Sequence, residues 1–197
     1  MKNINAYILA GGKSSRMGTE KGLVQLNGKS FIEHIIQVLN KVNIQVYIIS
    51  NTKAYDFLGY PVIADIVEDK GPLGGIYTAL MHSQQQSNLI ISCDVPFVQE
   101  ELIRYLCEHI DASSQCIVPT HSGNSEPLCA IYTKEGMELI KEMISRNELG
   151  VRAALRRLET NFIEVSDEEF YSSMTFVNIN SKLDLEVVRA NLKNRNS

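Results

Sequence analysis

The N-terminal stretch AYILAGGKSSRMGTEKG, residues 6–22, joins an apolar segment to a loop rich in glycine and basic residues. The apolar part, residues 6–10, is expected to form a strand of a parallel sheet. In an open α/β sheet, ligands bind beyond the carboxyl ends of the strands, which is where this loop begins. Glycines let backbone N–H groups turn toward an anion, and Arg16 and Lys21 can neutralise phosphate charge. The stretch predicts a phosphate-binding loop, although an ordinary turn with solvated charges is also compatible with it.

The loop matches neither of the two common phosphate-binding patterns. It contains no GxGxxG sequence, which marks dinucleotide-binding loops, and Gly18 is followed by Thr19 where a Walker A loop has Lys and then Ser or Thr. Glycine and positive charge nevertheless coincide at the position where ligands bind in this type of sheet. The stretch therefore indicates a phosphate site of a different kind.

Short apolar segments alternate with helical patterns along the rest of the chain. The apolar segments are nearly continuous, as in parallel strands that are covered on both faces. They span residues 6–10, 45–50, 61–64, 89–93 and 115–118, with a weaker pair of mixed direction at 128–132 and 162–165. Helices are expected at residues 74–83, 99–109, 134–146, 151–158 and 182–192.

A further helix is marked by a capping box, the sequence SFIE at residues 30–33. Behind it, apolar residues recur every three or four positions from Ile32 to Val42, so they form one face of the helix. Alternating strands and helices imply right-handed crossovers. The sequence thus predicts an α/β fold with three layers, in which a mostly parallel, twisted, Rossmann-like sheet carries helices on both faces.

Length and composition are typical of one domain. The 197 residues are 44% hydrophobic, which is enough to bury a full core. Since no repeat or linker divides the chain, residues 1–197 are expected to form a single domain. The formal net charge of −4 argues against a surface for nucleic acid or an anionic membrane. A local basic pocket for a small anion is compatible with that charge.

The N-terminus and the cysteines predict a cytoplasmic protein. The chain passes from Met1-Lys2-Asn3 directly into an apolar segment, so no signal peptide is expected. No apolar run reaches the roughly 20 residues that a membrane span needs. The four cysteines, at positions 93, 107, 116 and 129, lack CxxC spacing. They are expected to be reduced and mostly buried thiols, with a metal or redox role as the alternative.

A second candidate site is the sequence SCDVP, residues 92–96, at the end of another apolar segment. A carboxylate in this position lies at the same edge of the sheet as the glycine-rich loop. Mg²⁺ prefers oxygen ligands and is often held between carboxylates and phosphates. Asp94 is therefore a candidate metal ligand, with a turn or a helix cap as the alternative role.

Other polar residues also follow predicted strands. Asp65 can accept hydrogen bonds from a base or a ribose, or help to orient the metal. Asn51 can contact a base edge or a phosphate, or form a turn. The sequence GPLGG at 71–75 would let a ligand lie close to a helix N-terminus, although a plain helix start has the same sequence. Residues 126–128 and 178–180 are candidates for an acceptor pocket, with turns as the alternative.

Together these motifs resemble those of the MobA family, the molybdenum cofactor guanylyltransferases. The family pattern LAGGxSxRMGxDK is present as LAGGKSSRMGTEK, residues 9–21, with Glu20 in place of the Asp. The later landmarks match in order over nearly the whole chain. They are Asn51, Asp65, GPLGG at 71–75, CDVP at 93–96, EPL at 126–128 and NIN at 178–180.

The resemblance implies a nucleotidyltransferase fold and a Mg²⁺-dependent transfer of GMP from GTP to the terminal phosphate of molybdopterin, with release of pyrophosphate. Related cytidylyltransferases usually have Ala-Ala-Gly where this chain has Ala10-Gly11-Gly12, so Gly11 favours guanine. Asp94 is implied to bind both the nucleotide and Mg²⁺. The other residues implied to bind the nucleotide are Leu9, Ala10, Gly11, Gly12, Lys21, Asn51 and Asp65.

On this interpretation Arg16, Lys21 and Asp94 are the catalytic residues, acting by charge neutralisation and positioning without a covalent nucleophile. The expected partners are GTP, molybdopterin or the molybdenum cofactor, other cofactor-biosynthesis proteins and apo-molybdoenzymes. Two alternatives remain open. One is a cytidylyltransferase or sugar-phosphate nucleotidyltransferase on the same fold, and the other is a non-catalytic nucleotide or cofactor carrier.

Overall fold

The structure is a computed structural model that describes residues 4–11 and 20–195, with side chains to residue 192. Within these residues the main sheet has eight strands, in the order β10-β7-β9-β6-β1-β4-β5, and β8 pairs with β7. The strands are β1 (Ile4–Leu9), β4 (Gln45–Ile49), β5 (Val62–Ile63), β6 (Ser87–Ser92), β7 (Cys116–His121), β8 (Asn124–Ser125), β9 (Cys129–Thr133) and β10 (Thr160–Glu164). All seven predicted strands are present, with shifted ends.

The directions of the strands confirm a mostly parallel sheet. β1 runs parallel to β4 and β6, β4 to β5, and β10 to β7. β9 is antiparallel to both β6 and β7. Of the two strands predicted at residues 128–132 and 162–165, the first is therefore reversed relative to its neighbours, whereas the second, β10, runs parallel to β7. Because the direction reverses twice between β6 and β7, these strands end at the same edge of the sheet as β1.

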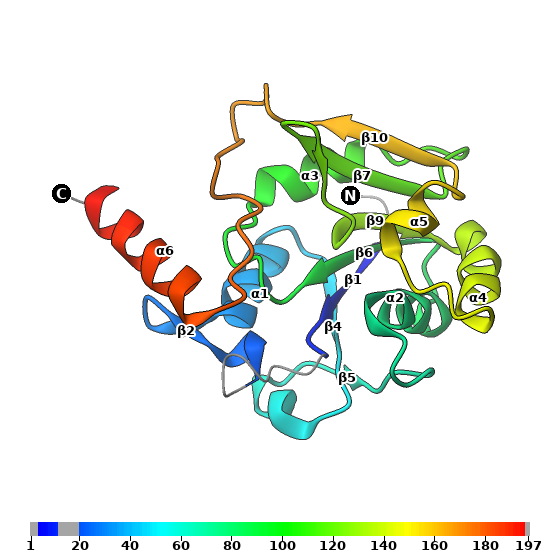
Figure 1. The fold of residues 1–197 in the computed structure, drawn as a ribbon, viewed down its shortest axis with the longest axis horizontal. Coiled ribbons are helices and arrows are strands. Elements are labelled where there is room, and N and C mark those ends of the chain that lie inside the picture. Colours follow the sequence, from blue (N-terminus) through cyan, green and yellow to red (C-terminus); the bar gives the residue numbers. More distant parts are fainter. Residues whose placement is uncertain (1–3, 12–19, 196–197) are drawn as a thin grey trace.

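Helices cover both faces of the sheet, as predicted (Figure 1). α1 (Phe31–Lys41) and α3 (Glu100–Glu108) pack on one face. The opposite face carries α2 (Gly71–His82), α4 (Met137–Ser145) and α5 (Val151–Leu155). In the described part of the chain, none of the helices combines the length and apolar character needed to cross a membrane.

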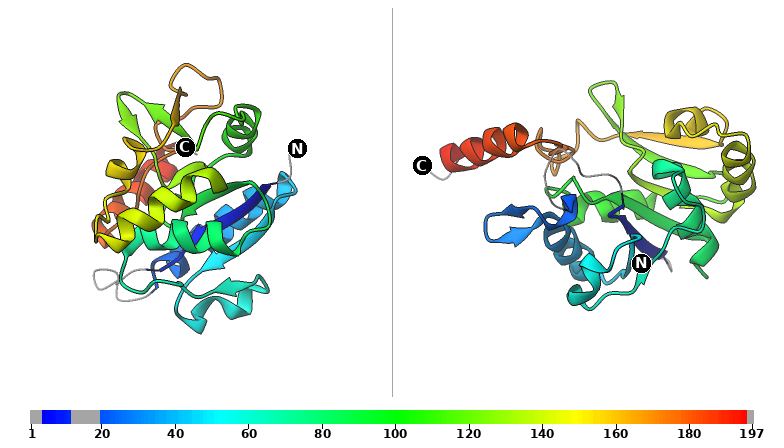
Figure 2. Two further views of the ribbon diagram at one scale, coloured as in Figure 1. Left: turned by 90° about the vertical axis from the view of Figure 1, so that its right-hand side faces the viewer. Right: turned by 60° about the horizontal axis from the view of Figure 1, so that its bottom comes forward.

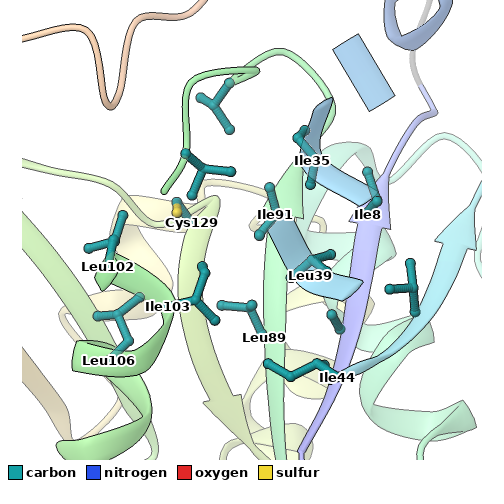
Figure 3. Close-up of a cluster of buried hydrophobic side chains, with 14 of the residues drawn as sticks. Ile8, Ile35, Leu39, Ile44, Leu89, Ile91, Leu102, Ile103, Leu106 and Cys129 are labelled. Carbon is teal, nitrogen blue, oxygen red and sulfur yellow. The ribbon is translucent and has the colours of Figure 1, made fainter. Parts of the chain in front are cut away.

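The core between the sheet and α1 and α3 is formed by aliphatic side chains (Figure 3). Fully burying one such side chain is favourable by about 1.5–3 kcal/mol, so this layer fixes the sheet that carries the site. Its fully buried members include Ile8, Ile35, Leu39, Leu89, Ile91, Leu102, Ile103 and Leu106.

The capping box at the start of α1 is present. Glu33 Oε2 accepts hydrogen bonds from Ser30 N at 2.7 Å and from Ser30 Oγ at 2.5 Å. Other helix boundaries differ from the prediction. α2 begins at Gly71 rather than at residue 74, because Pro72 is well suited to a first helical turn. The helix expected at 134–146 begins with a 3₁₀ turn, η3 (Lys134–Gly136).

A hairpin beside α1 was not predicted. Its strands are β2 (Gln25–Leu26) and β3 (Lys29–Ser30), and they follow the 3₁₀ turn η1 (Lys21–Leu23). Asn27 and Gly28 have φ of 51° and 82°, as a tight two-residue hairpin turn requires. The hairpin packs with α6 (Lys182–Arg195) in a small core of its own. Figure 2 shows this unit at the side of the main sheet.

Candidate functional site

A cavity of about 560 Å³ opens at the carboxyl edge of strands β1, β4, β5 and β6. Its volume lies in the range of ordinary small-molecule sites. The wall includes three residues that were singled out because they follow strand ends, Gly11, Asn51 and Asp65. The start of α2, including Gly71, Pro72 and Gly75, forms another part of it. The parallel sheet therefore brings the predicted nucleotide-side residues together.

Asn51 and Asp65 hold each other in place across the ends of β4 and β5. Asp65 N donates to Asn51 Oδ1 at 2.8 Å, and Asn51 Nδ2 donates to Asp65 Oδ2 at 3.3 Å. Asp65 Oδ1 is buried and has no hydrogen-bond partner among the described residues. Burial raises the pKa of the Asp65 carboxyl above its ordinary value, although the hydrogen bond from Asn51 opposes the shift. The pair thus places a carboxylate and an amide in the wall of the cavity.

Two glycines allow close approach in this cavity. A Cβ on Gly11 would lie 3.7 Å from Asp65 Oδ2, so a methyl group there would partly cover the carboxylate. A Cβ on Gly75 would lie 3.0 Å from Leu9 Cδ2, which shows how tightly α2 packs on β1. Leu9 also lines the cavity. Ala10 is buried behind it, and its N–H bonds Ile49 O at 3.0 Å.

A second group of residues is centred on Asp94. This residue lies two positions after Ser92 in the chain, and Ser92 lines the cavity. The Lys21 ammonium contacts Asp94 Oδ2 and also Asn180 Oδ1. Asp94 O accepts a hydrogen bond from Ile179 N at 3.2 Å. Residues 178–180, predicted for an acceptor pocket or a turn, therefore reach the Lys21–Asp94 pair from far along the chain.

The Asp94 side chain, predicted as a metal ligand, is nearly buried. Asp94 as a whole is 8% exposed. Its Oδ1 atom is buried and has no hydrogen-bond partner in the described part of the chain. In the same part, no group of three or more His, Cys, Asp or Glu side chains could enclose a metal. In nucleotide sites Mg²⁺ is often held by one or two carboxylates together with phosphates and water.

The central part of the glycine-rich loop, with Gly12 and Arg16, lies outside the described residues. The residues on either side of it are joined by Tyr55, from the 3₁₀ helix η2 (Lys53–Leu58), which was not predicted. Tyr55 Oη lies 3.3 Å from Ala10 O and 3.4 Å from Glu20 Oε2. Burial raises the pKa of Tyr55 well above its ordinary value, so its hydroxyl remains a donor.

Some residues that line the cavity could not be assigned to it from the sequence, because the local pattern was too weak. Lys70 lines the wall, and its Nζ donates to Asn147 Oδ1 at 3.1 Å. Its neighbours Asp69 and Gly71 both have positive φ, 54° and 58°, so the turn that presents Lys70 has a local cause. Leu128, from the EPL motif, lines the cavity and its carbonyl accepts from Ser92 N at 2.7 Å.

The four cysteines behave as expected for structural thiols: all are buried and free. Burial raises the pKa of Cys93, next to Asp94, to about 12. A thiol with such a pKa is not a nucleophile at neutral pH. The site therefore consists of backbone, amide, carboxylate and ammonium groups.

A mostly parallel sheet covered on both faces, with a cavity at the carboxyl edge of its strands, is the architecture expected of an α/β nucleotidyltransferase. Residues 6–161 match the family model described as the MobA-like NTP transferase domain. The chain belongs to this family.

Individual relatives agree with that assignment. A protein of Flavobacterium johnsoniae named "Probable molybdenum cofactor guanylyltransferase" is 40% identical over 192 residues, covering 98% of this chain and 100% of the relative. One with the same name from Aquifex aeolicus is 31% identical over 93% of this chain and 89% of its own. The crystal structure of molybdopterin-guanine dinucleotide biosynthesis protein A from Archaeoglobus fulgidus is similar, with a TM-score of 0.80 and 27% identity over 96% of this chain and 99% of that one.

Proposed function

We propose that this protein transfers GMP from GTP to the terminal phosphate of molybdopterin or the molybdenum cofactor, forming the guanine dinucleotide cofactor and pyrophosphate. The observation that carries the proposal is the Lys21–Asp94 pair beside a cavity whose wall holds the Asp65 carboxylate. This arrangement offers one position for phosphates and another for a base. The names of the relatives support the choice of the two substrates.

In the proposed reaction an acceptor phosphate oxygen attacks the α-phosphorus of GTP, and the bond to the β-phosphate oxygen breaks as pyrophosphate leaves. Both reactants are anions, so positioning and charge neutralisation supply most of the rate enhancement. Lys21 and Arg16 would offset the charge on the leaving pyrophosphate. Loop amides around Gly11 and Gly12 would add donors for the phosphates. The raised pKa of Cys93 agrees with a mechanism without a covalent protein intermediate.

Asp94 would hold Mg²⁺ through its unpaired Oδ1. The ion would supply positive charge that offsets the repulsion between the reacting phosphates. Lys21 already occupies the other carboxylate oxygen, Oδ2. Asp94 can therefore orient the lysine and the ion from opposite oxygens of one side chain.

The base preference is assigned to Asp65 and Gly11. Guanine presents two neighbouring donors, its ring N1–H and its 2-amino group, whereas the same edge of cytosine offers no such pair. A carboxylate is an acceptor-only group that suits these donors, and Asp65 Oδ1 is unpaired. The absence of a side chain at Gly11 keeps Asp65 Oδ2 uncovered. Leu9, Ala10 and Asn51 complete the proposed nucleotide site.

We also propose that residues 1–197 work as one nucleotidyltransferase domain. Support comes from the C-terminal part of the chain, outside the matched residues 6–161, which reaches the Lys21–Asp94 pair through Ile179 and Asn180. A cytoplasmic location and contacts with other cofactor-biosynthesis proteins and apo-molybdoenzymes belong to the same proposal. Four free, buried thiols agree with a reducing compartment.

The test is pyrophosphate release from GTP, CTP, ATP and UTP in Mg²⁺, with and without molybdopterin. We expect release with GTP and only when the acceptor is present. Thermal unfolding with each nucleotide gives a second measure, since a ligand at 100 times its Kd stabilises by about 2.7 kcal/mol. Preference for CTP or UTP would show the cytidylyl or sugar-phosphate alternative. Tight GTP binding without pyrophosphate release would show a carrier.

A further inference from the structure

A cluster of four side chains lies at the carboxyl end of β7. His121 Nε2 is 2.9 Å from Glu126 Oε1, and Tyr171 Oη is 3.1 Å from His121 Nδ1. The His121 ring stacks on Phe176, with ring centroids 4.8 Å apart and planes inclined by 21°. The side chains of His121 and Glu126 are only 18% and 21% exposed. Neither histidine nor tyrosine was assigned a role from the sequence.

For a neutral His121 ring, both hydrogen bonds of this cluster have a defined direction. The Glu126 carboxylate can only accept, so Nε2 of the His121 ring carries the proton that it donates. A neutral ring then has Nδ1 free as an acceptor, and the Tyr171 hydroxyl donates to it. A neutral His121 thus uses both nitrogens and links β7 to a residue 50 positions further along the chain.

Glu126 fixes this cluster to the edge of the sheet where the site lies. Its N–H donates to Pro119 O at 3.0 Å, and its carbonyl accepts from Cys129 N at 3.0 Å. Two residues further, Leu128 lines the nucleotide cavity. Since β7 and β6 end at the same edge, His121 is on the side of the site away from Asn51 and Asp65.

The segment that His121 holds is residues 171–180, which we call the strap. It runs between β10 and α6, in orange in Figure 1, and it contains no helix or strand. Phe176 anchors it in the main core, and Ile179 in the small core with the hairpin. At its end Ile179 N bonds Asp94 O, and Asn180 contacts Lys21.

We propose that His121, oriented by Glu126, is a positioning residue for the transfer step: by holding Tyr171 and Phe176 it sets the strap, and the strap sets Asn180 on Lys21. This inference rests on the proposed function and deepens it, because it assigns the acceptor half of the site to β7 and the strap. His121 acts through Asn180 and Lys21. Nucleotide binding at Asn51 and Asp65 does not depend on it.

The first test needs no substrate. Hydrogen exchange of the free protein is followed in peptides covering the strap, in the wild type and in His121→Ala. Losing the two hydrogen bonds of the ring is expected to speed exchange at Ile179 on the order of tenfold. Exchange in α2 is expected to be unchanged. Unchanged strap exchange in a folded variant would overturn the inference, whatever the enzyme's substrates prove to be.

The chain offers a matched control in His82. Its Nδ1 is 3.0 Å from Oη of Tyr7 in β1, the same type of histidine–tyrosine contact. His82 is the last residue of α2, whose first residue, Gly71, lines the cavity. At 1.5 Å per residue the helix places His82 about 16 Å from that end. His82→Ala is expected to lower the melting temperature but to leave strap exchange and turnover unchanged.

The second test separates binding from turnover. In His121→Ala, kcat is expected to fall about tenfold and KM for the acceptor to rise, while the Kd for GTP stays within about twofold of the wild type. Equal losses in GTP binding and turnover would indicate general damage and overturn the inference. Should the wild type itself not release pyrophosphate from GTP and molybdopterin, the proposed function fails, and the exchange test still decides the role of His121 in the strap.

Milder variants cover the case in which His121→Ala does not fold. Tyr171→Phe removes one hydroxyl and keeps the ring, so a smaller loss of the same pattern is expected. Glu126→Gln retains a carbonyl acceptor for Nε2–H and is expected to keep most of the activity, whereas Glu126→Leu is expected to behave like His121→Ala. Equal activity of the Gln and Leu variants would contradict an orienting role for Glu126.

Discussion

The two halves of the site are built in different ways. On the nucleotide side, Gly11, Asn51 and Asp65 follow the ends of adjacent parallel strands, so the topology of the sheet alone brings them together. On the proposed acceptor side, His121 and Asn180 are joined, within the described residues, through the strap, an irregular segment held by side-chain contacts. The first half follows from the order of the strands in the sheet, and the second depends on side-chain contacts between distant parts of the chain.

This difference leads to separate expectations for the two halves. Changes on the nucleotide side are expected to alter affinity and base preference, and changes on the acceptor side are expected to alter turnover. Asp94 lies between them, since its side chain contacts Lys21 and its carbonyl is bonded by the strap. Substitutions at these three places test whether the halves are independent.

The largest effect is expected at Asp94. Asp94→Asn keeps the shape but removes the charge that holds Lys21 and the proposed ion, so kcat is expected to fall about 10²–10³-fold. Pyrophosphate release at saturating GTP and Mg²⁺ measures it. Lys21→Ala is expected to give a loss of similar size, with Lys29→Ala, an exposed lysine bonded to Gln37, as the control. Near-normal turnover in Asp94→Asn would refute its assignment.

The next effect is expected at Asp65, on the nucleotide side. Asp65→Asn replaces an acceptor with a group that is part donor, and losing a charge-assisted hydrogen bond costs about 1.5–3 kcal/mol. GTP is therefore expected to bind about 10- to 100-fold more weakly, with kcat at saturation much less affected. Titration calorimetry with GTP and CTP checks this, with the exposed Glu68→Gln as control. Unchanged GTP affinity would remove Asp65 from the nucleotide site.

Although Asp65→Asn is expected to weaken GTP binding, it is expected to raise the stability of the free protein. Because burial raises the pKa of Asp65 in the folded protein, the folded state binds its proton more tightly than the unfolded chain does. Stability is therefore lost as the pH rises from the ordinary value of 3.8 through the raised pKa, and the loss persists at neutral pH. Asp65→Asn is expected to melt higher than the wild type at pH 7, and this advantage is expected to shrink as the pH falls through the raised pKa toward 3.8.

A smaller effect is expected on the acceptor side. Asn180→Ala removes one neutral partner of Lys21, and one such hydrogen bond contributes about 0.5–1.5 kcal/mol, so kcat is expected to fall roughly three- to tenfold. GTP affinity is expected to stay unchanged, which separates this variant from Asp65→Asn. The neighbouring Ser181→Ala is a poor control because Ser181 Oγ accepts from Asp184 N. Lys182→Ala, at the start of α6, is a better one.

Sequence patterns were sufficient to predict the fold and to predict that Gly11, Asn51 and Asp65 lie at one edge of the sheet. Strands such as β1 and β6 are continuous apolar segments, and a parallel sheet then requires residues that follow strand ends to share one edge. The direction of β10 was not predictable in this way, because direction depends on how the intervening connections pass over the sheet. The hairpin β2–β3 had a local signal, Asn27-Gly28, but its strands are only two residues long.

The acceptor side and the support of the loop could not be predicted in the same way. Tyr55 lies in a 3₁₀ helix, where neither a helical nor a strand period is expressed. His121 and Tyr171 are 50 residues apart, and nothing near either residue in the sequence indicates the other. Only the NIN motif marked the strap, and its sequence is equally compatible with a turn.

The smallest effect is expected outside both halves, at the capping box of α1. Ser30→Ala removes the bond from Ser30 Oγ to Glu33 and is expected to cost about 1 kcal/mol, or roughly 2–4 °C in melting temperature for a chain of this size. GTP affinity and kcat are expected to stay unchanged, because α1 packs behind the sheet. A loss of turnover would show that the core and the site are coupled, and that the two halves are not independent.

The pH dependence of the melting temperature shows whether the hydrogen bond from Ser30 to Glu33 is responsible for the lower stability of Ser30→Ala. Hydrogen bonds from Ser30 hold the pKa of Glu33 below its ordinary value of 4.5. A lowered carboxyl pKa contributes stability that is present above the unfolded value and is lost as the pH falls through the folded one. The difference in melting temperature between the wild type and Ser30→Ala is therefore expected to be full at pH 7 and to decrease below pH 4.5. A difference that stays constant with pH would assign the effect to packing of the buried Ser30 side chain instead.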